Sequence, residues 1–140
     1  MKKYGDFHDG FLDGLWVDGS IAHVYLRTLE NEASTLVGTD VAALTLTDFK
    51  QGNIIFDVIV RGSDEICLDD IRWLYLLPEG EVGENQALEL LAKAHDERLS
   101  VLEITPSYGA VCMILARSFD LMTRQLWLER YLMNDATNKR

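Results

Sequence analysis

A histidine and an aspartate stand side by side near the start of the chain, at His8 and Asp9, with Asp13 four residues further on. Imidazole and carboxylate groups ligate the metal ions used in metal-assisted hydrolysis. Only two further histidines occur, and in the expected hairpin His23 lies about 20 Å along the strand from His8, too far to share a metal unless the chain folds back before Phe11. We therefore expect no functional metal and keep His8, Asp9 and Asp13, with His23 as a further ligand, as weak candidates for an alternative hydrolase function.

Other catalytic signatures are absent from the sequence. It contains neither common Gly-rich phosphate loop and no G-x-S-x-G nucleophile elbow. Ser107 has no adjacent base. Cys67 and Cys112 lie among apolar neighbours and form no C-x-x-C pair, so we expect reduced, buried, inert thiols. These observations favour a protein that is not an enzyme and uses no cofactor.

The three Asp-Gly pairs near the start indicate turns rather than chemistry. Asp18-Gly19 stands between alternating apolar runs, which predicts a β-hairpin with these two residues as its turn. One face of the hairpin then forms core, and the other carries Trp16, His23 and Tyr25. We interpret this second face as another packed surface, with a partner-binding surface as the alternative.

Further strands are expected over 31–38, 41–49 and 54–61, and two more over 100–122 around the sequence PSYG. The segment 63–78 fits a helical turn or a strand, and we favour a turn followed by a strand. The clearest helix covers 85–99, with Asn85 as its N-cap and His95 on its apolar face as a half-buried packing residue. Strands that precede a late helix, without β-α-β alternation, predict the α+β class.

We therefore expect one domain over 1–140, built mainly from antiparallel β structure. Seven to nine short strands would form a half-barrel or a two-layer sandwich, with helix 85–99 packed on it and a short helix near the C-terminus. Thr123 caps this last helix, whose apolar side chains spread around much of its surface. Such a helix contacts neighbours on more than one side, through a homodimer contact or within its own chain; the dimer candidates are Trp127, Leu128 and Tyr131.

The chain is acidic, with 23 Asp and Glu against 13 Lys and Arg and a net charge of −10. Phosphate backbones need a basic face, so nucleic acid is not an expected partner. No apolar run is long enough to span a membrane, and the two lysines at the start precede no apolar stretch of a signal peptide. A cytoplasmic protein is therefore expected. The acidic residues form a solvated rim or dock a basic protein; the candidates are Asp64, Glu65, Asp69 and Asp70.

Three short stretches carry a resemblance to a group of known proteins: Phe7-His8-Asp9, Gly52-Asn53-Ile54-Ile55 and Ser107-Tyr108-Gly109. Together they resemble small, β-rich, largely uncharacterised bacterial families that open with Phe-His-Asp and close with a Ser-Tyr-Gly hairpin. Some of these families are immunity proteins that neutralise polymorphic toxins. The resemblance implies no catalytic residues, and it does not extend to the last helix, 124–133.

The sequence thus favours a non-enzymatic, cytoplasmic protein-binding module with an immunity-like role and a basic partner. The alternatives are the metal-assisted hydrolase and a self-associating module held together by the last helix. His8 and Asp9 are expected to bond backbone groups where the first strand joins the sheet, and Gly52 and Gly109 to provide turn conformations.

Overall fold

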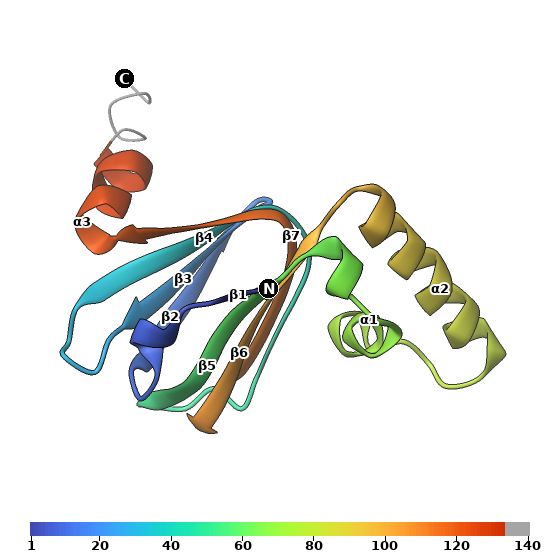
Figure 1. Cartoon of the computed structure of the whole chain (residues 1–140), viewed down its shortest axis with the longest axis horizontal. Helices are drawn as coiled ribbons and strands as arrows, with labels where there is room; N and C mark the ends of the chain where they lie inside the picture. Colours follow the sequence, from blue (N-terminus) through green and yellow to red (C-terminus); the bar gives the residue numbers. More distant parts are fainter. Residues whose placement is uncertain (134–140) are drawn as a thin grey trace.

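The computed structural model describes residues 1–133, and it confirms the predicted α+β class with an antiparallel sheet (Figure 1). Seven strands form one sheet, two helices stand together beside it, and a short helix follows the last strand. The strands are β1 (Lys2–Lys3), β2 (Phe11–Asp18), β3 (Ile21–Arg27), β4 (Ala33–Thr47), β5 (Asn53–Arg61), β6 (Ser100–Tyr108) and β7 (Val111–Thr123). The helices are α1 (Leu68–Tyr75), α2 (Glu81–Asp96) and α3 (Arg124–Trp127).

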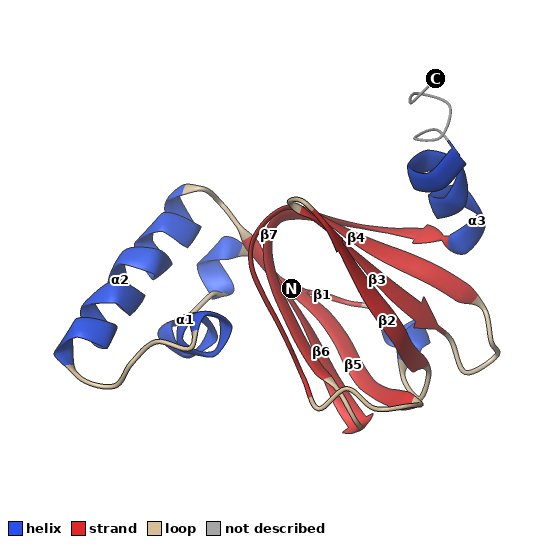
Figure 2. Ribbon diagram, turned by 180° about the vertical axis from the view of Figure 1, so that it is seen from behind, coloured by secondary structure: helices blue, strands red, loops and turns tan. Residues whose placement is uncertain are grey.

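The sheet closes on itself. Its strand order is β1-β5-β2-β3-β4-β7-β6, and β5 also pairs with β6, so that six strands form a continuous ring (Figure 2). The ring closes between β2 and β5 through the pairs Phe11–Ile54 and Leu12–Asn53. This curvature goes beyond the predicted half-barrel, and the two-layer sandwich is not formed.

The first hairpin forms with its turn one residue later than predicted, which shifts its register by two residues. Its turn is Gly19-Ser20 rather than Asp18-Gly19, because β2 continues to Asp18, which pairs with Ile21. Gly19 has the positive φ of 58° that such a turn requires. Consequently Trp16 lies directly opposite His23.

A bulge in β2 changes which side chains enter the core. The pairing shifts between Leu12 and Gly14, and the extra residue reverses the alternation of side chains before it. The sequence predicts a core face that contains Phe11 on β2 and Ala22, Val24 and Leu26 on β3. The three β3 residues are buried, but Leu12 is buried in place of Phe11.

One long strand replaces two predicted ones. β4 runs through both 31–38 and 41–49 because Asp40, at φ 55°, and an irregularity between Val41 and Ala43 bend the strand without ending it. This is the usual effect of a bulge, which increases local twist and curvature. The bend lets β4 pair with β7 along nearly its whole length.

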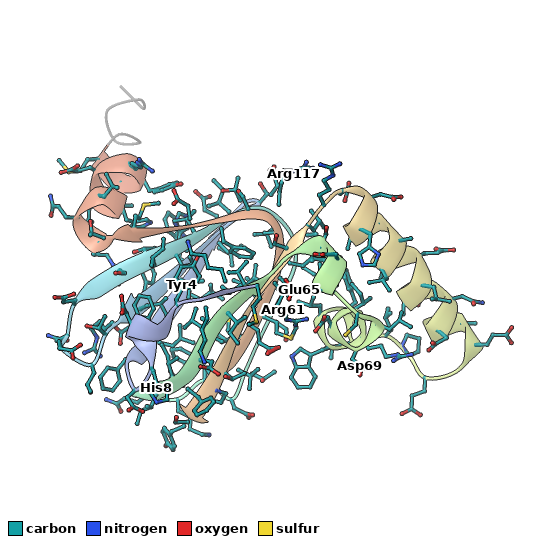
Figure 3. The ribbon with its side chains drawn as sticks, viewed as in Figure 1. Tyr4, His8, Arg61, Glu65, Asp69 and Arg117 are labelled. Carbon is teal, nitrogen blue, oxygen red and sulfur yellow. The ribbon has the colours of Figure 1, made fainter. Side chains whose placement is uncertain are left out.

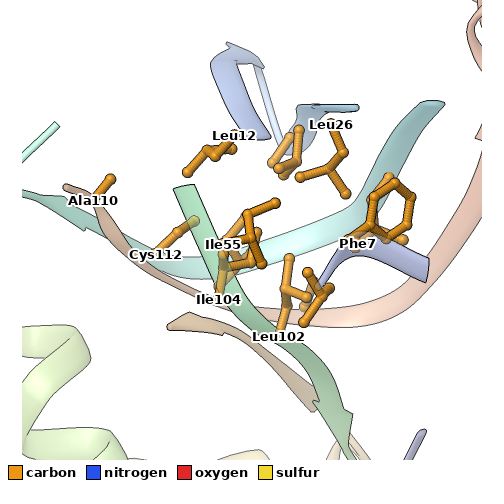
Figure 4. Packing of buried hydrophobic residues seen from close by; sticks show 14 residues of the cluster. Phe7, Leu12, Leu26, Ile55, Leu102, Ile104, Ala110 and Cys112 are labelled. Carbon is orange, nitrogen blue, oxygen red and sulfur yellow. The ribbon is translucent and has the colours of Figure 1, made fainter. Parts of the chain in front are cut away.

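The core inside the ring is apolar (Figure 4). Phe7, Leu12 and Leu26 meet Ile55 and Leu102 there, all of them buried. Asn53 is the buried polar residue at its margin. Its amide donates to the carbonyls of Leu12 and Lys50 and accepts from the N–H groups of Lys50 and Ala110, so its burial is compensated.

The segment between β5 and β6 is helical, so the expectation of a turn and a strand over 63–78 is wrong. α1 begins after Cys67, whose N–H donates to the Asp70 carboxylate at 2.9 Å, and Ile71 and Leu74 then face the interior together. That cap decides between the two readings, because the apolar run fits either. α2 begins at Glu81 rather than after Asn85, with Gly80 at its N-cap.

The two helices form a projecting hairpin, which we call the helical hairpin (residues 63–97) (Figure 1). α1 packs against the outer side of β4 and β7, and α2 packs against α1. A second apolar cluster joins the helices to the sheet and includes Ile71, Ala87, Ala94, Met113 and Leu115. No helix in residues 1–133 is long and apolar enough to cross a membrane.

Candidate partner-binding surface

The metal candidates do not converge. The His8 Nδ1 atom lies 2.7 Å from the Phe56 carbonyl oxygen, and its Nε2 atom lies 3.7 Å from the Asp9 carboxylate. Asp13 instead forms two hydrogen bonds with the Arg27 guanidinium, at 2.5 and 2.8 Å. Within residues 1–133 no group of three or more His, Cys, Asp or Glu residues is placed to hold a metal ion.

His8 and its neighbours instead connect the start of the chain to β5. His8 bonds the Phe56 carbonyl through its side chain, as predicted, whereas Asp9 uses its backbone N–H, which donates to the Ile55 carbonyl at 3.0 Å. Gly10 is required here because a Cβ atom at this position would lie 2.2 Å from the Arg27 carbonyl oxygen. The Phe-His-Asp-Gly stretch is therefore a structural junction.

The other two resemblance stretches meet at the same junction. Ile54 pairs with Tyr108, and the Ala110 N–H donates to Asn53 at 3.0 Å. Gly52 and Gly109 both have positive φ, at 77° and 92°, as expected for turn residues. Three stretches far apart in the sequence thus serve one structural purpose at one end of β5.

The aromatic face of the first hairpin is covered at His23 and half-covered at Tyr25, whereas Trp16 is 37% exposed. His23 is 1% exposed and stacks on Trp16, with ring centroids 4.5 Å apart. Trp127 donates its indole N–H to His23 Nδ1 at 2.9 Å and contacts the Tyr25 ring edge-on. Because an indole N–H can only donate, His23 Nδ1 is the acceptor. His23 therefore cannot contact a partner directly, and the packed-face interpretation describes it better.

The last helix supplies this cover. The Thr123 hydroxyl accepts from the Leu126 N–H at 3.2 Å, which confirms the predicted cap. α3 continues as a π-helical segment over Leu128–Met133. Trp127 is 5% exposed in its own chain and so is not available as a dimer contact, whereas Leu128 and Tyr131 are half-buried and remain predicted contacts.

The predicted acidic residues lie on the helical hairpin, but they differ in availability. Asp70 is buried and binds Arg61 through two hydrogen bonds, so it does not face a partner. Glu65 pairs with the N-terminal ammonium at 2.8 Å, and Asp69 pairs with Arg72 at 2.9 Å. Asp64 is exposed. Figure 3 shows Glu65 and Asp69 at the hairpin, away from His8.

Electrostatics explain why Asp70 stays ionised although it is buried. Burial raises the pKa of this carboxyl, but hydrogen bonds from Arg61 and from the Cys67 N–H outweigh that effect, and the pKa lies below its usual value. The N-terminal ammonium, aided by the Gly62 N–H, likewise lowers the pKa of Glu65.

Negative charge is concentrated on the helical hairpin. Residues 63–97 contain ten Asp and Glu but only two cationic residues, Arg72 and Lys93, which gives a net charge of −8. The other 105 residues carry thirteen acids and eleven bases, a net charge of −2. One quarter of the chain therefore carries most of the net charge of the protein.

Large apolar side chains are exposed on the same hairpin. Trp73 is 45% exposed, Leu76 is 80% exposed and Val82 is 69% exposed. An open groove of about 390 Å³ lies along α2 and is lined by Leu77, Gln86, Glu89, Leu90 and Lys93. Exposed apolar side chains that gather on one part of a protein are a feature of protein-binding surfaces.

Sequence reasoning missed Trp73 and Leu76 because it placed them on a strand. Asp70 follows Cys67 by three residues, which is the spacing of a helix-capping pair. This spacing could have indicated a helix over the segment that contains Trp73 and Leu76. His95 was also misplaced: it is exposed rather than half-buried, and its Nε2 atom lies 3.2 Å from the Ile66 carbonyl oxygen.

The two cysteines differ in burial. Burial raises the pKa of the Cys112 thiol to about 12, which makes it inert, as expected. Cys67 is exposed, so the expectation that it is buried is wrong. Cys67 is the N-cap residue of α1, and its N–H donates to the Asp70 carboxylate.

Comparison with family models, with curated proteins and with solved structures finds no match to this chain.

Proposed function

We propose that this protein is a non-enzymatic, cytoplasmic binding module whose helical hairpin docks a basic protein partner. The observation that carries the proposal is the net charge of −8 on residues 63–97, against −2 on the rest of the chain. An acidic patch that faces a basic patch steers association and raises its rate by roughly 10- to 1,000-fold. The partner is therefore a protein with a clustered basic surface.

Apolar contacts supply the stability of the complex. Charge pairs at the rim of an interface contribute mainly to association rate, whereas buried aromatic and aliphatic anchors slow dissociation. Trp73 and Leu76 provide such anchors within the acidic surface. An immunity-like role follows naturally, because a toxin that acts on nucleic acid presents basic residues to its substrate, and an acidic protein blocks that surface.

The two alternative functions have less support. For a metal-assisted hydrolase, His8, Asp9 and Asp13 would have to converge on one ion, but His8 and Asp13 are already engaged with Phe56 and Arg27. For self-association, Leu128 and Tyr131 remain available on the last helix, but Trp127 covers His23 in its own chain.

Affinity capture from a lysate of the native cells tests the proposal. Three baits are compared: the wild-type chain, a hairpin triple variant (Glu79→Gln, Glu81→Gln, Glu89→Gln) and a sheet triple variant (Glu30→Gln, Glu32→Gln, Asp48→Asn). All six side chains are exposed, and none pairs with a cation among the described residues. Each variant therefore removes three negative charges, one from the helical hairpin and the other from outside it.

We expect the wild-type and sheet-variant baits to retain one stoichiometric basic protein, released near 1 M salt, where the screening length is about 3 Å. The hairpin variant should lose it. Capture of no basic protein, or equal capture by all three baits, would contradict the proposal.

A further inference from the structure

The hairpin surface also indicates the form of the segment that it binds. We propose that the groove along α2 receives an amphipathic, basic α-helix of the partner, an inference that rests on the proposed function. Partner segments are commonly recognised by strand addition to a sheet edge or by insertion of a helix into an apolar groove. The two modes require different surfaces, so the fold discriminates between them.

Strand addition would need a free edge of the sheet. Residues 14–18 of β2 pair only with β3, and residues 118–123 of β7 pair only with β4. β1, which is paired only with β5, is two residues long. Its residues are Lys2 and Lys3, which repel a basic segment. The net charge of −8 lies on the helical hairpin rather than on these edges, so the hairpin matches a basic segment better and favours the helix-in-groove mode.

The residues that line the groove follow one face of α2. Residues at positions i, i+4, i+7, i+8 and i+11 share one face of a helix, and on α2 these positions are Val82, Gln86, Glu89, Leu90 and Lys93. The stripe extends over three turns, about 17 Å at 1.5 Å per residue. Four of its five members line the groove, together with Leu77 from the connection between the helices. Ridges of a second helix fit such a groove.

The hairpin that carries the groove has a net charge of −8, which favours a basic occupant. Glu89 lies in the groove itself, and Glu79 and Glu81 lie at the start of α2, where the stripe begins. Lys93 is the one cation in the groove lining and lies toward its other end. Leucine-type anchors on one face of the occupant would contact Leu77 and Leu90, and lysine or arginine side chains beside them would reach the carboxylates.

Leu76, which precedes the groove residue Leu77 in the chain, adds an independent observation. It adopts the left-handed conformation, with φ 47° and ψ 52°, at the C-cap of α1, a position that favours glycine. It is also 80% exposed, so its side chain adds almost nothing to the packing of the chain itself. A strained, exposed leucine beside Leu77 is explained by contact with a partner.

The test uses the full chain, ¹⁵N-labelled, and three fluorescent peptides of about 14 residues, four helical turns. The first peptide consists of Leu and Lys with Leu on one helical face. The second has the same composition in strict alternation, which is amphipathic as a strand, and the third replaces Lys by Glu. Amide shifts report where each peptide binds, and fluorescence anisotropy reports how tightly.

We expect the helix-patterned Lys peptide to bind at least tenfold more tightly than the other two and to shift amides along 76–93. Val82→Ala, at an exposed position, and Leu76→Gly, which relieves the left-handed strain, should each weaken binding several-fold without unfolding the chain. Leu88→Ala is the matched control, because Leu88 is 49% exposed on another face of α2. It should leave binding unchanged.

Equal binding of the helix- and strand-patterned peptides, or the same loss for Leu88→Ala as for Val82→Ala, would overturn the inference. If the hairpin triple variant still loses the cellular partner, the proposed function survives that result and only the helical occupant fails. If the hairpin triple variant retains the partner, the proposed function itself fails.

Discussion

Arg61, the last residue of β5, binds Asp70 in the first turn of α1 through two hydrogen bonds of 2.7 and 2.8 Å. The same guanidinium lies 3.5 Å from the Glu103 carboxylate on β6 and donates to the Glu65 carbonyl. Arg61 therefore joins the sheet to the helical hairpin at the point where the chain leaves the sheet (Figure 3). The orientation of the acidic surface depends on this contact.

Asp70→Asn should lower the free energy of unfolding by about 2–3 kcal/mol at pH 7, because Arg61 loses its charged partner in a half-buried site. The Asp70 pKa is lowered in the folded state, so the pair stabilises the fold above the unfolded carboxyl pKa of about 3.9. This stabilisation is lost as the pH falls through the folded pKa. Urea unfolding from pH 7 to pH 3 should therefore show the difference between wild type and variant narrowing below about pH 4.

Asp69→Asn is the control for that measurement. Asp69 is exposed and pairs with Arg72 at the surface, so the substitution should cost less than about 0.5 kcal/mol. A difference for Asp70→Asn that stays constant down to pH 3 would show that its ionisation does not stabilise the fold.

The structural role of the Phe-His-Asp-Gly stretch leads to a second prediction. His8→Ala should cost about 1 kcal/mol, from loss of the hydrogen bond to the Phe56 carbonyl. Gly10→Ala should cost more, about 2–4 kcal/mol, because its Cβ would meet the Arg27 carbonyl oxygen at 2.2 Å. Thermal or urea unfolding measures both. A Gly10→Ala variant as stable as wild type would contradict the junction geometry.

Trp127→Phe tests the cover over the aromatic face. The phenyl ring cannot donate to His23 Nδ1, so we expect a loss of about 2 kcal/mol from the missing hydrogen bond and the smaller ring. Leu126→Ala, at a more exposed position on α3, should cost less than 1 kcal/mol. Equal losses for the two variants would show that the bond to His23 adds no stability.

Thiol reactivity separates the two cysteines. With an aromatic disulfide reagent at pH 8, Cys67 should react in the folded protein, because it is exposed. Cys112 should react only on unfolding, since its pKa of about 12 leaves on the order of one thiolate in 10,000 molecules. Two fast thiols in the native protein would contradict the burial of Cys112.

Local patterns in the sequence predicted the elements better than their exact limits. Alternating apolar residues identified β3 and β5, and Thr123 identified the start of the last helix. The exact turn of the first hairpin and the bulge before Gly14 could not be predicted, because both depend on how β2 pairs with β3. The ring closes through two residue pairs between β2 and β5. The paired residues are about 40 positions apart in the chain, so no local pattern predicts the closure.

The candidate site was predicted in part. The acidic residues 64–70 were identified by charge alone, but charge does not reveal that Asp70 is turned inward to Arg61. His23 was recognised on an aromatic face, yet its burial depends on Trp127, 104 residues later. Trp73 and Leu76 were missed because an apolar run fits a strand or a helix equally well until a capping contact is known.

The central claim is that the helical hairpin, rather than acidity in general, binds the partner. The most direct test measures the association rate of the captured partner with wild type, with the hairpin triple variant and with the sheet triple variant at two salt concentrations. We predict that neutralising Glu79, Glu81 and Glu89 slows association about tenfold at low salt and weakens its salt dependence, while the sheet variant behaves as wild type. Equal slowing by both variants would contradict the claim.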